Sequence, residues 1–255
     1  MQSPDEDKIR LFPKSKSDDL SSYAHRQLIG YVGLFLPLLL YLTAGWRPVE
    51  GLPRWELLGS ISAYYYTGAV AFFCGALVAL GLFLYTYHGY RNSYNVLDRV
   101  FAVIAGTAAI LVALFPTGAP TSSVSTPWWI PAMGYIHYTS AVVFFLCLVV
   151  FSVYLFTRPG QQKETVAESN KGNMRNYIYV FCGVAILACL LWALLAGVNK
   201  WPIFWPEAFS LWFFSISWLV KGRAEITIAN GVSILRHPRK TARYLRNAIW
   251  AKEAQ

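Results

Sequence analysis

Long apolar blocks separated by short polar stretches dominate the pattern of this chain. The blocks are about 18 to 25 residues long, which at 1.5 Å per residue matches a hydrocarbon core of roughly 30 Å. Small residues recur at intervals within them, which favours helices over the strict alternation of membrane strands. The sequence therefore predicts an all-α, polytopic integral membrane protein with six transmembrane helices, near 29–45, 65–87, 98–116, 135–157, 177–197 and 203–220.

Composition supports a membrane as the solvent, and the distribution of charge predicts an orientation. Hydrophobic residues make up 56% of the chain and charged residues only 14%, against roughly a quarter charged in soluble domains. Of the 22 Lys and Arg residues, all but Arg47, Arg54 and Lys200 lie on one side of the six predicted spans. By the positive-inside rule we expect both termini to be cytoplasmic (N-in/C-in).

Three regions follow from this topology: a cytoplasmic tail at 1–28, a transmembrane domain at 29–220 and a basic amphipathic cytoplasmic tail at 221–255. The last region contains a plausible helix with apolar residues on one side. A basic amphipathic segment beside a membrane is typical of contact with anionic lipid rather than nucleic acid. The predicted lipid-contact residues are Arg236, Arg239, Lys240, Arg243 and Arg246.

Small residues inside the spans predict where helices approach one another. Gly68, Gly75 and Gly81 keep small side chains near one face of the second span, and the third span offers Ala102, Gly106 and Ala109. Pro37 predicts a kink in the first span. The chain has four cysteines, all within predicted spans and without metal-ligand spacing, so we interpret them as packing residues.

Two stretches of the chain have similar sequences. The sequence YTGAVAFF at 66–73 nearly repeats as YTSAVVFF at 138–145. Two helical hairpins with the same direction could be tandem copies, a parallel repeat, although chance and shared membrane constraints explain the likeness equally well. In this alignment Tyr65 stands in the place of His137.

Polar residues gather at the outer ends of the predicted spans. His137 and Glu207 are the ionisable side chains expected just inside the outer boundary, and Glu207 is the natural partner of His137. The alternative interpretation of Glu207 is an acid at a helix start, and that of the serines is helix capping. Ser210, Phe214 and Ser217 share one helical face with Glu207, and we expect this face to point at protein or water rather than lipid. The predicted ligand-binding residues are His137, Glu207, Ser62, Tyr65 and Ser140.

The same residues allow several chemistries. A Ser–His–Glu hydrolase would use Ser60 or Ser62 as nucleophile, His137 as base and Glu207 as orienter, although no G-x-S-x-G motif is present. One outer histidine beside a few carboxylates does not make a zinc site, so we expect no metal and no cofactor. An ion pathway would need polar groups through the full depth of the membrane. We interpret Asp98 as a carboxylate at a helix start.

The order of Ser-Ile-Ser at 60–62, Ala-Gly-Thr-Ala-Ala at 105–109, Leu-Phe-Pro at 114–116 and Ile-His-Tyr-Thr-Ser-Ala at 136–141 resembles uncharacterised bacterial multi-pass membrane proteins. More remotely it is similar to the DRAM-like six-span family of eukaryotes. The resemblance implies six spans, cytoplasmic termini, a bacterial plasma (inner) membrane and a link to lipid remodelling or distribution. Ser60 or Ser62, His137 and Ser140 stand at matching positions. Ala63 stands where the eukaryotic pattern has an acid.

The leading hypothesis is a multi-pass protein that organises or senses lipid through an outer-facing polar pocket, with membrane lipids as its partners and no nucleic acid. A membrane-embedded lipid hydrolase or transferase using the same residues is the alternative, and a small-molecule or ion transporter comes third.

Overall fold

The described part of the chain is all-helical, as predicted. The computed structural model describes residues 16–87, 95–122, 124–158 and 166–224. Within these ranges there are six α-helices, a short 3₁₀ helix and a π-helical turn that continues α4, and no strand. The elements are α1 Lys16–Trp46, η1 Ser62–Tyr66, α2 Val70–Thr86, α3 Asn95–Leu114, α4 Pro131–Val150, η2 Phe151–Leu155, α5 Val166–Val198 and α6 Phe204–Lys221.

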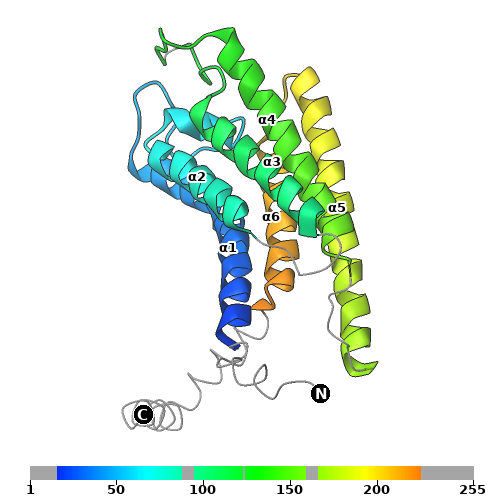
Figure 1. Ribbon diagram of the computed structural model, residues 1–255. Coiled ribbons are helices and arrows are strands. Elements are labelled where there is room, and N and C mark those ends of the chain that lie inside the picture. Colours follow the sequence, from blue (N-terminus) through cyan, green and yellow to red (C-terminus); the bar gives the residue numbers. More distant parts are fainter. Residues whose placement is uncertain (1–15, 88–94, 123, 159–165, 225–255) are drawn as a thin grey trace, which may run out of the picture.

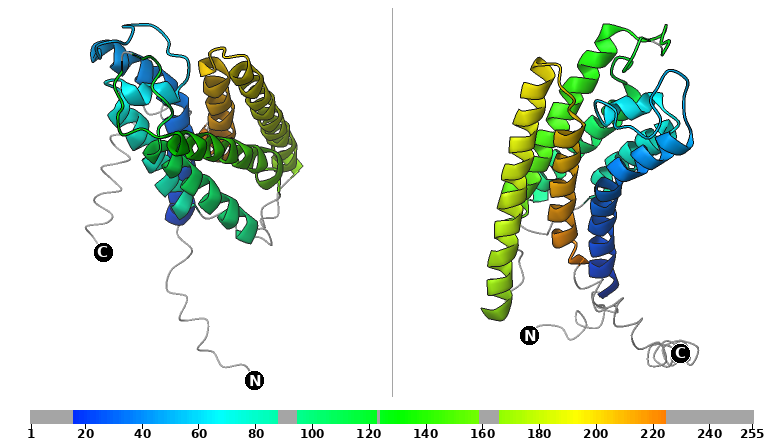
Figure 2. Two further views of the ribbon diagram at one scale, coloured as in Figure 1. Left: turned by 90° about the horizontal axis from the view of Figure 1, so that it is seen from above. Right: turned by 180° about the vertical axis from the view of Figure 1, so that it is seen from behind.

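The six helices run alternately between two ends of one bundle (Figure 1). The lower end in that view holds the start of α1 and the end of α6, and the upper end holds the loops 47–69, 115–130 and 199–203. The helix α3 packs between α2 and α4, and α6 packs between α1 and α5, an arrangement that Figure 2 shows from two further sides. Contact between α1 and α2 is less extensive.

Among the described residues, four helices are long and apolar enough to cross a membrane, which by length and composition is typical of a helical membrane protein. The qualifying segments are Ala24–Trp46, Val96–Leu114, Pro131–Leu155 and Met174–Val198. They correspond to the first, third, fourth and fifth predicted spans. The helix α2 is apolar but has only 17 residues, and α6 is too polar to qualify, since it carries Glu207, three serines and Lys221.

The element boundaries differ from the predicted ones in three places. Helix α1 begins at Lys16, so part of the predicted tail 1–28 is helical. Helix α5 begins at Val166 instead of residue 177, because helix formation does not stop where the apolar run stops. Helix α2 begins at Val70 instead of residue 65, because the preceding tyrosines lie in η1. The predicted lipid-contact residues 236–246 lie outside the described residues.

Close packing of α2 on α3 confirms the role predicted for Gly81 and for the small residues of α3. A Cβ atom built on Gly81 would lie 2.8 Å from the carbonyl oxygen of Gly106, and the reverse is equally true. Ala102 and Ala109 are fully buried on the same side of α3. Gly75 is different, because a Cβ there would meet nothing within 4 Å. Its predicted packing role is therefore wrong.

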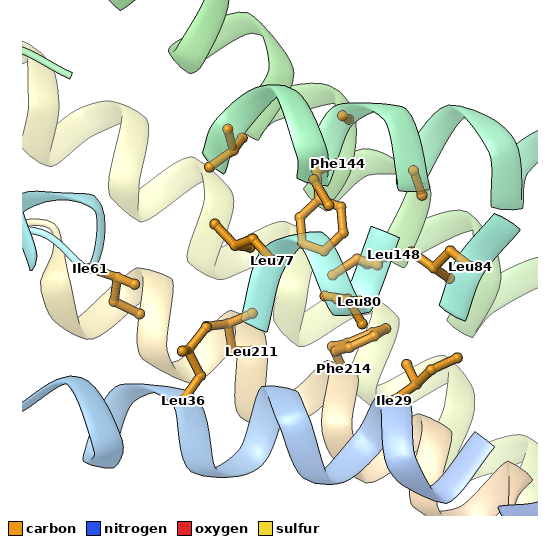
Figure 3. Close-up of a cluster of buried hydrophobic side chains, with 14 of the residues drawn as sticks. Ile29, Leu36, Ile61, Leu77, Leu80, Leu84, Phe144, Leu148, Leu211 and Phe214 are labelled. Carbon is orange, nitrogen blue, oxygen red and sulfur yellow. The ribbon is translucent and has the colours of Figure 1, made fainter. Parts of the chain in front are cut away.

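Aromatic and aliphatic side chains fill the middle of the bundle (Figure 3). The rings of Phe144 on α4 and Phe214 on α6 lie 6.5 Å apart at their centroids, and leucines of α2 surround them. All four cysteines are free, and three of them are buried. This apolar middle separates two groups of buried polar side chains, one at each end of the bundle.

Helix α1 bends along its length, as Figure 1 shows, and Pro37 lies inside it. Proline removes one backbone donor and its ring pushes away the preceding turn, which is the physical cause of such kinks. The predicted kink is confirmed.

Candidate functional site

His137 connects α4 to two other segments at the upper end. Its helix begins at Pro131, a residue suited to the first turn because its fixed backbone needs no N–H there. The His137 side chain is only 2% exposed. Its Nδ1 atom lies 2.7 Å from the carbonyl oxygen of Phe115, and its Nε2 atom lies 2.8 Å from Ser62 Oγ. Both ring nitrogens therefore have partners within the protein.

These contacts assign the proton on the neutral imidazole. A carbonyl oxygen can only accept, so His137 Nδ1 carries the hydrogen and donates it to Phe115. Nε2 is then the acceptor, and the Ser62 hydroxyl donates to it. A serine bonded to the unprotonated nitrogen of a histidine that a third group orients is the geometry of an activated hydroxyl. The same geometry also serves as a structural tie between η1 and α4.

Glu207 secures η1 from the opposite side. The carboxylate projects from the first turn of α6, and its Oε2 accepts a hydrogen bond of 2.6 Å from the backbone N–H of Ile61. Ser60 Oγ accepts a second one, 3.0 Å long, from the N–H of Ala63. The capping role predicted for this serine-rich turn is thus confirmed for Ser60. The short helix η1 is held between α4 and α6 by side chains from both.

The predicted hydrogen bond between His137 and Glu207 is not formed. The two nitrogens of His137 are engaged with Phe115 and Ser62, and Glu207 bonds to the backbone of Ile61. The acid and the histidine instead hold consecutive residues of one segment, Ile61 and Ser62. Glu207 therefore does not complete a Ser–His–Glu triad, and a backbone carbonyl takes the place of the orienting acid.

The two remaining predicted residues lie close by. Ser140 is buried on α4, one turn beyond His137. Tyr65 packs edge-on against Tyr66 and Phe73. Tyr66 donates its hydroxyl hydrogen to the carbonyl of Thr117. Burial, with smaller contributions from neighbouring tyrosines, raises the pKa of Tyr66 to about 12, so this phenol stays protonated and can donate.

An apolar groove of about 250 Å³ lies between α1 and α2, where these helices make less contact. Its walls carry no charged side chain. Phe35, Leu39 and Phe72 are 41–48% exposed, so this surface faces the surroundings of the bundle. The lining residues are Tyr31, Val32, Phe35, Leu36 and Leu39 from α1, and Phe72 and Ala76 from α2.

The lower end holds a second polar group that sequence reasoning missed. Arg26, Asp98 and Lys221 are only 2%, 6% and 8% exposed. The predicted topology places Arg26 in the tail 1–28 and Lys221 in the tail 221–255, because both stand at the edges of apolar runs. One signal could have found Lys221: it extends the predicted protein-facing stripe of Ser210, Phe214 and Ser217 by one turn. These three positions are buried, as predicted.

Metal binding finds no support in the part of the chain that the structure describes, where no three His, Cys, Asp or Glu side chains lie close enough together to hold an ion. In comparisons with known proteins, no protein-family model, no curated protein and no solved structure matches the chain. The resemblance to the DRAM-like family stays a prediction.

Proposed function

We propose that this protein is a six-span membrane protein, with both termini in the cytoplasm, that organises or senses membrane lipid at its upper, outer end. The described residues form six α-helices, and their alternating course in Figure 1 supports six crossings. The near absence of Lys and Arg from the outer loops, where only Arg47, Arg54 and Lys200 occur, supports the orientation.

The groove between α1 and α2 is the observation that carries the lipid proposal. Its seven lining residues are all apolar or aromatic and come from two helices of a membrane protein. A concave apolar strip that faces hydrocarbon fits a lipid acyl chain, because the chain gains dispersion contacts that it lacks on a convex helix surface. The polar group of Ser62, His137 and Glu207 lies at the upper end, where a headgroup would stand.

Filling the groove tests this proposal. The full-length protein would be reconstituted with phosphatidylglycerol that carries a diazirine on one acyl chain, and labelled peptides would be mapped by mass spectrometry. Ala76→Phe should abolish labelling of α1 and α2, because Ala76 lines the groove. Ala71→Phe adds the same bulk at an exposed position of α2 outside the groove and should leave labelling intact. Equal labelling in both variants would refute the proposal.

Topology has its own test. A cytoplasm-active reporter fused after residue 255 should be active, and one inserted in the loop between α5 and α6 should not. The reverse pattern would invert the orientation and move the Ser62–His137 group to the cytoplasmic side.

A lipid hydrolase or acyl transferase is the second candidate, favoured by the 2.8 Å contact between Ser62 Oγ and His137 Nε2. A fluorophosphonate probe should label the wild-type protein and Ser60→Ala but not Ser62→Ala. If the probe labels none of the three proteins and the lipid profile of the Ser62→Ala strain is unchanged, the outer end has no hydrolase or transferase activity, and lipid binding is its role.

A further inference from the structure

The upper end of α1 carries a cation that has no partner within the described part of the chain. Arg47 directly follows Trp46, the last residue of α1, and its side chain is exposed. Its backbone N–H continues the helix by bonding to the carbonyl of Thr43 at 2.9 Å. Its guanidinium forms no hydrogen bond or ion pair among the described residues. A fixed positive charge with five N–H donors is therefore available to a ligand.

Arg47 lies where α1 meets the start of α2. A Cβ atom built on Gly68 would collide with Arg47 Cβ and with the Arg47 carbonyl oxygen, so this close approach requires a glycine. Gly68 precedes α2 and lies four residues before Phe72, which lines the apolar groove. The contact therefore holds the Arg47 backbone at the upper end of the helix pair that forms the groove.

The separation between Arg47 and the groove suits a single lipid molecule. Leu39, the uppermost groove residue of α1, lies eight residues before Arg47, which is about 12 Å along a helix. One leaflet contributes about half of the hydrocarbon core, or roughly 15 Å. An acyl chain whose headgroup contacts Arg47 therefore reaches the groove beside Leu39.

The residue before Arg47 indicates its depth in the membrane. Trp46 is 70% exposed at the end of the apolar segment Ala24–Trp46. Exposed tryptophan is enriched where hydrocarbon meets headgroups, because its ring is largely apolar and its N–H is polar. Arg47 is one residue further from the apolar segment, so its charge lies at the level of the lipid phosphates.

The charges around Arg47 favour an anion as the ligand. Helix α2 begins at Val70, two residues after Gly68, so the positive end of its macrodipole lies nearby. Glu50 and Glu56 belong to the same loop, but both are exposed and neither pairs with Arg47 in the described structure. An arginine binds phosphate oxygens through two parallel N–H···O bonds. A lipid phosphate fits the guanidinium as its acyl chain fits the groove.

We propose that the groove binds an anionic phospholipid, whose acyl chain lies between α1 and α2 and whose phosphate accepts hydrogen bonds from Arg47. The assignment rests on the proposed function of the groove and adds the class of lipid. The groove walls carry no charge, so selection by headgroup depends on Arg47. A headgroup without a cation of its own gains more from this contact than a zwitterionic one.

Competition for photolabelling tests the proposal. The full-length protein in maltoside micelles would be labelled with the diazirine phosphatidylglycerol, and unlabelled dioleoyl phosphatidylglycerol or dioleoyl phosphatidylcholine would be added. Phosphatidylglycerol should suppress labelling of α1 and α2 at about fivefold lower concentration, the effect of one cation close to an anionic lipid. Absence of labelling without competitor would refute the groove itself. Equal suppression by the two lipids would overturn only the choice of an anionic lipid.

Three variants locate the preference. Arg47→Gln should make the two competitors equal, whereas Arg47→Lys retains the charge and should retain most of the preference. Lys200→Gln removes a positive charge from another exposed loop residue at the same end of the bundle, and should leave the preference unchanged. Equal losses in Arg47→Gln and Lys200→Gln would assign the preference to overall charge and overturn the role of Arg47. A preference that survives Arg47→Gln would overturn it as well.

Discussion

The hydrogen bond between Ser62 and His137 offers a quantitative test of how the upper end is held together. Ser62→Ala leaves His137 Nε2 without its donor, while His137→Leu leaves both the Ser62 hydroxyl and the Phe115 carbonyl without a partner. Each unpaired buried group costs about 1–3 kcal/mol. The expected losses in unfolding free energy are therefore about 1–3 kcal/mol for Ser62→Ala and about 2–6 kcal/mol for His137→Leu.

The double variant isolates the bond itself. When Ser62 is already replaced, His137→Leu leaves only the Phe115 carbonyl without a hydrogen-bond donor. The double variant should therefore lose less unfolding free energy than the two single variants combined. Coupling energies for hydrogen bonds in membrane proteins average about 0.6 kcal/mol and reach about 1.7. Stranding Nε2 and the Ser62 hydroxyl with no substitute partner for either would give about 2–6 kcal/mol. Both residues are less than 9% exposed, so we expect a coupling at or above the upper end of the measured range.

Unfolding in mixed micelles titrated with sodium dodecyl sulfate, followed by the fluorescence of the 10 tryptophans, gives these free energies. The exposed hydrogen bond between Tyr85 and Thr107, 2.6 Å long, is a matched control. Its Tyr85→Phe and Thr107→Ala cycle should yield less coupling, because Thr107 Oγ1 also donates to the carbonyl of Val103 at 2.9 Å. Additivity within about 0.3 kcal/mol at Ser62 and His137 would refute a stabilising bond there.

Three further predictions concern packing and polar contacts. Gly81→Leu should lower the unfolding free energy by about 1–3 kcal/mol in the same titration, since its Cβ would meet a carbonyl oxygen of α3 at 2.8 Å, whereas Gly75→Leu should change it little. Glu207→Gln keeps an acceptor for the backbone N–H before η1 and should destabilise less than Glu207→Leu; equal losses would show that this bond is not formed. Ser152→Ala removes a buried 3.0 Å hydrogen bond to Ser217 and should cost about 0.5–1.5 kcal/mol, measured by the shift in unfolding midpoint.

Sequence patterns predicted the helices and the clustering of polar residues at one end, but not which side chains touch. The length of the apolar blocks indicates that the chain crosses a bilayer. Helical periodicity indicates which face of a helix is buried, as the stripe from Ser210 to Ser217 shows. Neither identifies a partner across a gap of 75 residues. The pairing of His137 with Glu207 is wrong, and the contact with Ser62 was predicted only in the hydrolase alternative, where Ser60 was an equal candidate. The types of side chain available favoured an acid as the hydrogen-bond partner of the histidine. In the folded protein its partners are a serine hydroxyl and a backbone carbonyl.

The lower-end group was missed for a related reason. Arg26 and Lys221 stand at the edges of apolar runs, where Lys and Arg usually serve topology and remain in water. Their burial depends on neighbours that converge only in the folded bundle, such as Tyr87 near Arg26 and Phe156 near Lys221. A count of charges by loop cannot separate a solvated cation from a buried one.

Helix α6 is one of the two predicted spans in the described chain that do not qualify by length and hydropathy; α2 is too short, whereas α6 is too polar. It lies between α1 and α5, and its stripe of Ser210, Phe214 and Ser217 is buried against protein rather than exposed on the bundle surface. A helix whose surroundings are mostly other helices does not need the apolar surface that lipid demands. Its polar residues can then connect the bundle at both ends, Glu207 to the backbone of Ile61 above and Lys221 to the carbonyl of Phe156 below. The features that make α6 a poor span by composition are the ones that make it the connecting element of the fold.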